Sequence, residues 1–533
     1  MTSRGSMSTI AAQVRDESGK RPGSKRDYDA KMPRASDWHV PIDPSQGIRV
    51  PIKAGWLRDM MHPYNHLEPG AMNRCDIDDS KRAKACIARK WLLLVALAGL
   101  ALYSASALAV PSFARQTGQA CTGCHVGGFG PQLTPFGRQF KLSGYTLKAG
   151  DKVGVPLSAM LVESYTHTQK AQVDVPAKNF SRNDNVELQQ ASVFLAGRIS
   201  EHLGVFSQAT YSENGGLLGW DNTELRYARA FAGAKHGGIW GLTINNNPSL
   251  TDVFNTAPAW QYPYMAPDLA PGAPAAPILF GGLAGQVIGA SAYAQIDGAW
   301  YVELGGYRSL SPSFLRHVNA DFSGRLSGLA PYARVAYTKD IAGGNIEVGG
   351  FALNARKGLV GQDLAGHAVA LEGPSDRFRD VGLDASYQYF GDGNHTITVN
   401  ALFVDERQRL DATFAEGGAE HQSGSLRALN LNASYWYHNT WGATLGAFAN
   451  DGSSDNILYG DTGTPNTRGG IVELNWTPGH HDMGAMGDHW FHYRLGAQYT
   501  FYTRFSGAVN NIDGAGRSAS DNNTMFVYLW VAM

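Results

Sequence analysis

Apolar and polar residues alternate along most of the chain after about position 153. In residues 381–390 the apolar positions are Val381, Leu383, Ala385, Tyr387 and Tyr389, each followed by a small or polar residue. Residues 395–403 repeat the pattern. A period of two is typical of β-strands, and no long amphipathic helix pattern appears after Gly150. The pattern predicts an all-β fold over residues 153–533.

Roughly sixteen such segments follow one another. They begin near Val155, Val186, Val205, Glu224, Ile239, Gln286, Trp300, Ala330, Asn345, Asp380, His395, Leu426, Trp441, Gly469, Trp490 and Thr524. Connections after even-numbered segments are short, such as SEHLG and FGDGN. Those after odd-numbered segments are long, such as 246–282, 309–328 and 357–377. Short turns at one rim and long loops at the other are typical of outer-membrane β-barrels.

We therefore predict a roughly 16-stranded, porin-like barrel over residues 153–533. An even strand number puts both barrel ends on the short-turn side, which is the periplasm. Asp384, Gln388, Thr398 and Asn400 lie on the polar face of their strands and are expected to face the lumen, because lipid would penalise them. The alternative is a run of soluble β-sandwich domains. The single unbroken run of strands, the 63 glycines and the aromatic residues near strand ends favour the barrel.

A secretion signal precedes the strands. Residues 81–90 (KRAKACIARK) are basic, residues 91–102 (WLLLVALAGLAL) are apolar, and residues 107–109 (ALA) form a small-x-small cleavage site. A membrane span would need roughly 20 apolar residues. We predict a signal peptide over residues 72–109, cleaved after Ala109. Residues 1–71 are rich in charge, Pro and Ser, and we expect a disordered extension or a stretch upstream of a true start at Met72.

Removal of the leader changes the charge balance. The whole chain has 45 Lys and Arg against 46 Asp and Glu; residues 1–109 hold 17 and 11 of these, so 28 basic and 35 acidic residues remain. A net charge of −7 argues against nucleic acid as a partner and favours cations over anions. Cys75 and Cys86 lie in the leader. Only Cys121 and Cys124 remain, which excludes a disulfide framework.

Cys121 and Cys124 precede His125 in the sequence CTGCH. In this pattern two thiols form thioethers with haem, and the histidine is an axial ligand of the iron. A zinc site needs a second pair of ligands, and a redox dithiol needs a thioredoxin-like pattern; the sequence shows neither. We predict one haem c on residues 110–152, with Cys121 and Cys124 as thioether residues and His125 as the iron ligand.

The sixth iron ligand is left open. Neither Met nor His occurs between His125 and Met160, so Met160 and His167 are the nearest candidates, although each can equally be an ordinary strand residue. Residues 480–489 (HHDMGAMGDH) are a further candidate or a solvated turn. A segment of about 40 residues seldom holds a core alone, so we expect it to dock at or plug the periplasmic mouth of the barrel.

Two stretches carry a family resemblance: CTGCHVGGFGPQLTPFGRQFKLSGYTL (121–147) and NNNPSLTDVFNTAPAWQYPY (245–264). With the order of parts from Val110 to Met533, they resemble the outer-membrane monohaem cytochrome–porin fusions of iron-oxidising bacteria. The resemblance implies a conduit for single electrons. A reductant outside the cell, expected to be Fe²⁺, reduces the haem, and a periplasmic cytochrome or copper protein receives the electron. The remaining partner is outer-membrane lipid.

The surface loop 246–282 is expected to guide a cation inward through Asp252, Tyr262, Tyr264 and Asp268, or to be a plain surface loop. Two other functions stay open. One is a solute porin whose haem segment is a plug or redox sensor. The other is a small peroxidase-like haem enzyme, which would need an open sixth position on the iron. Enzymatic activity beyond possible ferrous-iron oxidation is not decided by the sequence.

Overall fold

The computed structural model describes residues 111–150, 155–363, 366–478 and 492–533. The signal peptide, the start at Met72 and the candidate ligands in 480–489 lie outside the described residues. None of the described helices combines the length and apolar character needed to cross a bilayer.

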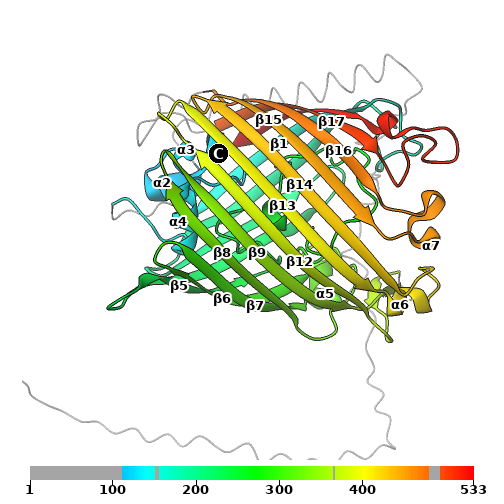
Figure 1. Ribbon diagram of the computed structural model, residues 1–533, viewed down its shortest axis with the longest axis horizontal. Helices are drawn as coiled ribbons and strands as arrows, with labels where there is room; N and C mark the ends of the chain where they lie inside the picture. Colours follow the sequence, from blue (N-terminus) through cyan, green and yellow to red (C-terminus); the bar gives the residue numbers. More distant parts are fainter. Residues whose placement is uncertain (1–110, 151–154, 364–365, 479–491) are drawn as a thin grey trace, which may run out of the picture. The chain divides into compact units, whose positions relative to one another are not determined.

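Sixteen strands among the described residues close into one antiparallel barrel, which confirms the predicted fold class (Figure 1). Neighbours in the wall follow chain order, and β18 pairs back with β1, with Met160 opposite Ala532. β10 (Val360–Gln362) and β11 (Ala368–Ala370) form a separate pair. The wall strands are β1 (Leu157–Thr168), β2 (Asn185–Arg198), β3 (Leu203–Tyr211), β4 (Leu218–Ala232), β5 (Gly237–Asn245), β6 (Val287–Ile296), β7 (Trp300–Ser309), β8 (Ala330–Ile341), β9 (Gly344–Lys357), β12 (Asp376–Tyr389), β13 (His395–Arg409), β14 (Ser423–Tyr437), β15 (Trp441–Gly452), β16 (Thr467–Trp476), β17 (His492–Arg504) and β18 (Thr524–Ala532).

The fourth strand departs most from its predicted start. It begins at Leu218 rather than near Glu224. A bulge explains the difference, because the β3–β4 register shifts between Ser207 and Ala209. A bulge interrupts the alternation of faces, so the period of two is lost just where the strand begins.

The two faces of the wall have opposite character. Outward residues are apolar and exposed, as Leu383 (61% exposed) and Leu304 (63%) show. Inward residues are polar and buried, among them Asp384, Gln388 and Thr398, as predicted. A closed barrel with an apolar exterior suits a bilayer, since lipid solvates that face and closure leaves no open sheet edge. These are the features of an outer-membrane barrel rather than of soluble sandwich domains.

The two rims differ in their connections. The short-turn rim is where β1 begins and β18 ends. It also carries the turns of six hairpins: β2–β3, β4–β5, β6–β7, β8–β9, β12–β13 and β14–β15. The long-loop rim carries α5 (Pro312–His317), α6 (Asp411–Ala415) and α7 (Asn456–Tyr459). Two connections break the predicted alternation of lengths. The β3–β4 connection at the long-loop rim is short, and the β16–β17 connection at the short-turn rim is long.

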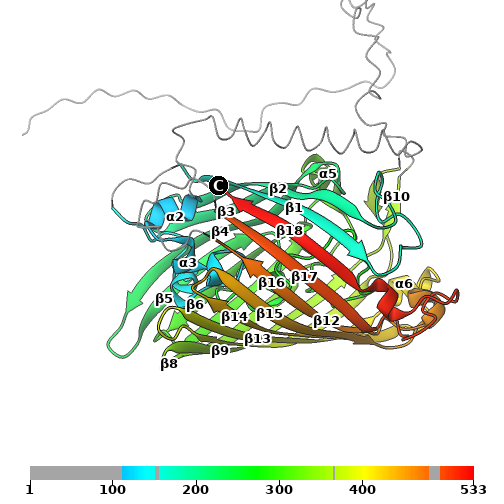
Figure 2. The same cartoon turned by 90° about the horizontal axis from the view of Figure 1, so that it is seen from above.

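Two segments occupy the lumen. The first is the N-terminal segment, residues 111–150, with α2 (Ser112–Thr117), α3 (Cys121–Cys124) and α4 (Pro135–Leu142). Figures 1 and 2 show α2 and α3 near the end of the barrel at which the chain ends, opposite α6. The second, here called the inward loop, is residues 246–286 between β5 and β6. Its prediction as a surface loop was wrong: Leu250, Thr251 and Asp252 have no exposed surface.

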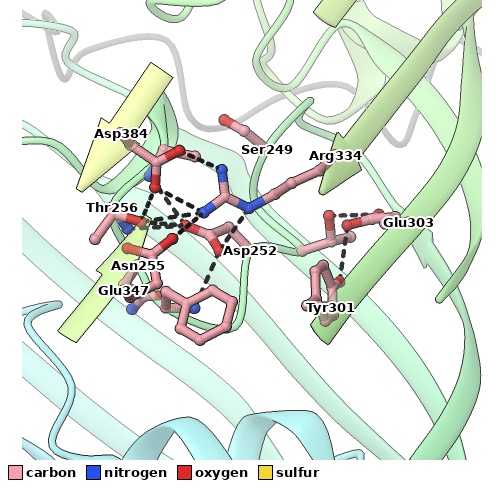
Figure 3. Close-up of polar contacts among 12 residues, drawn as sticks. Ser249, Asp252, Asn255, Thr256, Tyr301, Glu303, Arg334, Glu347 and Asp384 are labelled. Carbon is pink, nitrogen blue, oxygen red and sulfur yellow. Dashed lines mark hydrogen bonds and ion pairs between the residues drawn. The ribbon is translucent and has the colours of Figure 1, made fainter. Parts of the chain in front are cut away.

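Arg334 of β8 fixes the inward loop to the wall (Figure 3). Its guanidinium forms ion pairs with Asp252 of the loop at 3.1 Å, Asp384 of β12 at 2.7 Å and Glu347 of β9 at 3.3 Å. The Asp252 carboxylate also accepts the backbone N–H groups of Thr256 and Ala257, at 2.8 and 2.9 Å. All three ion-paired carboxylate side chains are fully buried, which is tolerated because the arginine compensates them.

The remainder of the inward loop is attached around the inside of the barrel. Glu406 and Asp380 accept the N–H groups of Ile278 at 2.5 Å and Leu279 at 3.1 Å. Further bonds run from Gln498 to the Met265 carbonyl, from Tyr502 to the Pro271 carbonyl and from Gln172 to the Leu269 carbonyl. The loop therefore contacts both halves of the wall instead of projecting into the surroundings.

Replacing the central arginine tests this account. In Arg334→Leu, three buried carboxylates lose their shared partner, and we expect a loss of roughly 3–5 kcal/mol of unfolding free energy. Release of the loop should also raise single-channel conductance in a planar bilayer. The control is Arg407→Leu, because Arg407 is 62% exposed and its ion pair with Asp405 should contribute little. Wild-type stability and conductance in Arg334→Leu would show that the loop is held by other contacts.

Candidate functional site

The CTGCH motif forms one helical turn followed by an extended residue. α3 spans Cys121–Cys124, and the His125 N–H donates to the Cys121 carbonyl at 2.8 Å. Residues three apart on a helix lie on the same side, so both thiols face one direction. His125 leaves the turn in extended conformation and pairs with Leu133 in an isolated β-bridge. Cys121, Cys124 and His125 therefore lie in one short segment, and the bridge between His125 and Leu133 closes the loop that follows it.

α4 packs directly on the backbone of the motif. Thr134 caps this helix by accepting the Gly137 N–H at 3.2 Å, and its hydroxyl donates to the Gly123 carbonyl at 2.5 Å. A Cβ at Gly137 would lie 2.3 Å from the Cys124 carbonyl oxygen. Only glycine allows this approach, which explains its place in the PFGRQF stretch.

The wall holds the N-terminal segment from several sides, near the short-turn rim. Arg138 donates to Asn345 and Ser386, both at 2.9 Å. Side chains of the wall and of the inward loop donate to backbone carbonyls of the segment: Arg494 to Gly127, Gln388 to Leu133, Asn255 to Pro131 and Tyr293 to Leu142. The donors come from β17, β12, β6 and the inward loop, so the segment fills the mouth of the barrel.

Lys141 joins the N-terminal segment to the inward loop. Its buried Nζ donates to the carbonyls of Leu250 and Asp252, both at 2.7 Å, and to Asn255 Oδ1 at 2.8 Å. The ring of Trp260 lies 4.6 Å away. Three acceptors match the three donors of an ammonium group. The residues that follow the CTGCH motif in the sequence are therefore the ones that dock it.

The electrostatics of the motif disfavour a redox dithiol. Burial raises the pKa of the Cys121 thiol to about 11 and, with the neighbouring Cys121, that of the Cys124 thiol to about 12. Redox dithiols need the opposite, a lowered thiol pKa. Burial lowers the pKa of His125 to about 4, and the charge of Arg494 acts in the same direction. The imidazole is neutral at pH 7, which is its metal-binding form.

Side chains of the kinds that hold a haem lie beside the segment that carries the motif. The His125 imidazole is buried, and the backbone of Gly130 lies close enough to act on it. Phe129, Trp436 and Trp530 supply apolar area. The guanidinium of Arg494 lies 4.5 Å from the ring centre of Trp436 and 5.3 Å from that of Phe129. Aromatic faces beside one buried arginine match a group with a flat apolar body and carboxylate arms.

The two candidates for the sixth iron ligand lie on opposite faces of β1. Met160 faces inward and packs against the cluster that contains Phe129. His167 lies on the outward face of the same strand, exposed, with Nδ1 2.7 Å from Asp184 Oδ1. Seven residues of strand put it roughly 23 Å from Met160. His167 is thus not brought to the N-terminal segment.

A cavity of about 330 Å³ lies between the inward loop and strands β14–β18. Its wall residues Asn450, Tyr502 and Thr524 stand at the long-loop ends of their strands. Tyr262 lines this cavity and packs edge-to-face on Tyr264, with ring centres 5.4 Å apart. Tyr264 in turn lines a small space beside Phe129 and Arg494. Aromatic residues therefore connect the cavity with the surroundings of His125.

Sequence reasoning placed Gln388 on the lumen face without giving it a part in the site, and it did not identify Arg494 and Trp436 as site residues. Arg494, Trp436 and Gln388 are single inward positions of separate strands, and each looks like an ordinary strand residue. One signal was present: all three stand at the short-turn ends of their strands, where a plugging segment would meet them.

Comparisons with known proteins give distant structural neighbours. No protein-family model and no curated protein matches the chain. An anion-selective porin from Comamonas acidovorans has 9% identity and a TM-score of 0.40, over 70% of this chain and 98% of that one. The outer-membrane channel DcaP of Acinetobacter baumannii has 10% identity and a TM-score of 0.39, over 71% and 96%. OmpT of Vibrio cholerae has 11% identity and a TM-score of 0.37, over 70% and 97%.

Proposed function

We propose that this protein is an outer-membrane c-type cytochrome of the cytochrome–porin fusion type. It conducts single electrons from extracellular Fe²⁺ to a periplasmic cytochrome or copper protein. One observation carries the proposal: the CTGCH motif stands inside the mouth of a barrel that its own segment and the inward loop fill. A filled lumen favours passage of electrons over passage of solutes.

Each residue of the motif has a distinct part. Cys121 and Cys124 anchor the haem covalently, and His125 holds its iron as a neutral imidazole. The haem, when bound, supplies one-electron chemistry. Arg494 sets a positive charge beside it, and Phe129, Trp436 and Trp530 exclude water.

The cavity shortens the route that the electron takes. A bilayer core is about 30 Å thick, too far for one haem to bridge from the periplasmic side. Fe²⁺ that enters the cavity from the long-loop rim stands next to Tyr262, with Tyr264 and Phe129 beyond. Each Fe²⁺ becomes Fe³⁺ and yields one electron, which leaves the protein on the periplasmic carrier.

The solute porin is the second candidate, and the same cavity favours it because small molecules enter such spaces. Liposomes that contain the reconstituted protein separate the two. Rapid swelling in small sugars supports the porin, whereas slow swelling supports the conduit.

The covalent link depends on three residues. The double variant Cys121→Ala, Cys124→Ala should lose haem stain after denaturing electrophoresis. His125→Ala should keep the stain and lose the low-spin optical spectrum, because the thioethers survive and the axial ligand does not. The control Thr122→Ala, between the two cysteines, should behave as wild type. A stain that persists in the double cysteine variant refutes covalent attachment.

Electron transfer is tested in proteoliposomes that hold an electron acceptor inside. External Fe²⁺ should reduce the haem and then the acceptor, and His125→Ala should abolish both. His167→Ala is the matched control, since this histidine faces outward beside Asp184 and should not change the rate. A haem that stays oxidised in excess Fe²⁺ rules out iron as donor. If every external reductant fails, the conduit itself is wrong.

A further inference from the structure

Four side chains on the lumen face of β1 and β2 carry buried oxygen atoms without hydrogen-bond partners among the described protein atoms. They are both carboxylate oxygens of Glu187, Oγ of Ser164, Oγ1 of Thr166 and Oε1 of Gln189. The four residues are between 1% and 3% exposed. A buried carboxylate without a partner costs several kcal/mol, so the two unpaired oxygens of Glu187, with unpaired neutral oxygens on the same lumen face, call for a ligand.

Strand register brings the side chains of Ser164 and Glu187 together. Ser164 stands directly opposite Glu187, and Thr166 follows two positions along β1 on the same face. The register shifts beside Val162, where Gln189 is the extra residue of β2. Gln189 lies two positions from Glu187, so strand alternation places both on the lumen face, and the bulge shifts the alternation only after Gln189.

The inward loop covers the same place. Gln189 Nε2 donates to the Ala266 carbonyl and lies 3.9 Å from Met265 Sδ. The amide nitrogen is thus bound to the loop, and the amide oxygen points elsewhere. Asp268 of the loop, together with Glu213 and Glu163, lies close enough to Glu187 to act on its charge. Acidic groups near Glu187 favour a cation over an anion at this place.

We propose that Glu187, Ser164 and Gln189 form a binding site for one hard divalent cation, of the class of Mg²⁺, Ca²⁺, Mn²⁺ and Fe²⁺. Carboxylate, hydroxyl and amide oxygens are the ligands that such ions select, and the set contains neither sulfur nor imidazole. Among the described residues no cluster of three or more His, Cys, Asp or Glu could hold a metal. One carboxylate with neutral oxygens gives weak, exchangeable binding.

The site adjoins the surroundings of the motif. Met265, in contact with Gln189, belongs to the same buried cluster as Phe129 and Trp530. Fe²⁺ bound at this site lies beside the buried apolar cluster that contains Phe129. Phe129 is four positions after His125 in the sequence. Fe²⁺ as the cation bound in the cell rests on the proposed function, whereas the binding of a divalent cation does not.

Mn²⁺ is the probe for the site. The full-length mature protein in detergent is titrated with Mn²⁺, and the signal of free Mn²⁺ is followed by electron paramagnetic resonance. We expect one Mn²⁺ per chain, bound at least about tenfold more weakly in Glu187→Gln and about threefold in Ser164→Ala. Ser192→Ala is the matched control. Ser192 is an equally buried serine of β2 whose hydroxyl already bonds Thr210, so binding should not change.

A second measurement separates this site from the proposed function. The Fe²⁺ concentration that gives half-maximal haem reduction should rise about tenfold in Glu187→Gln, with reduction by dithionite unchanged. If Mn²⁺ binding depends on Glu187 but Fe²⁺ does not reduce the haem, the cation site is supported and Fe²⁺ is not the electron donor. Absence of Mn²⁺ binding in wild type, or equal affinity in a Glu187→Gln protein that keeps the electrophoretic mobility of the folded barrel, overturns the site.

Discussion

The ion pair between Arg334 and Asp252 is the interaction on which the interior of this barrel depends. It fixes the loop that supplies the acceptors for Lys141, which are the carbonyls of Leu250 and Asp252. Lys141 belongs to α4, and α4 packs on the backbone of Cys124 through Gly137. A chain of direct contacts thus runs from the wall through the loop to the CTGCH motif. Electrostatic pairing deep in the lumen holds the motif in place, together with the aromatic cluster of Phe113, Phe140 and Tyr145 in its own segment.

Several of the acidic side chains of the protein are buried inside the barrel. Asp252, Asp380, Asp384, Glu347 and Glu406 are all buried in the lumen, where they bind arginine or backbone N–H groups. These carboxylates therefore do not form the acidic surface loops that were expected to attract cations. Glu187, by contrast, is a buried lumen carboxyl whose two oxygens have no hydrogen-bond partner among the described protein atoms.

The barrel was predictable because lipid imposes a strict rule: every second residue of each strand must be apolar. The site was predictable only in part. The CTGCH motif is a pattern of neighbouring residues, so the sequence alone reveals it. Strand alternation along β1 also places Met160 on the inward face with Val162, and His167 on the outward face with Leu161. The inward loop gave no such signal, because Asp252 binds Arg334, 82 positions away, and Thr256 binds Asp384, 128 positions away. Long-range ion pairs leave no period in the sequence, so the direction of the loop could not be predicted.

The contacts of the N-terminal segment also set an order of folding. Gly127 binds Arg494 across 367 residues, Leu133 binds Gln388 across 255, and Arg138 binds Asn345 across 207. Contacts at such sequence separation pay the largest loop-closure entropy and form late. The β1–β18 pair that closes the wall joins equally distant residues, so the N-terminal segment is synthesised first but reaches its final position only once its partners as far along as Arg494 exist. Any covalent modification of Cys121 and Cys124 has to be completed in that interval, while the thiols are still accessible.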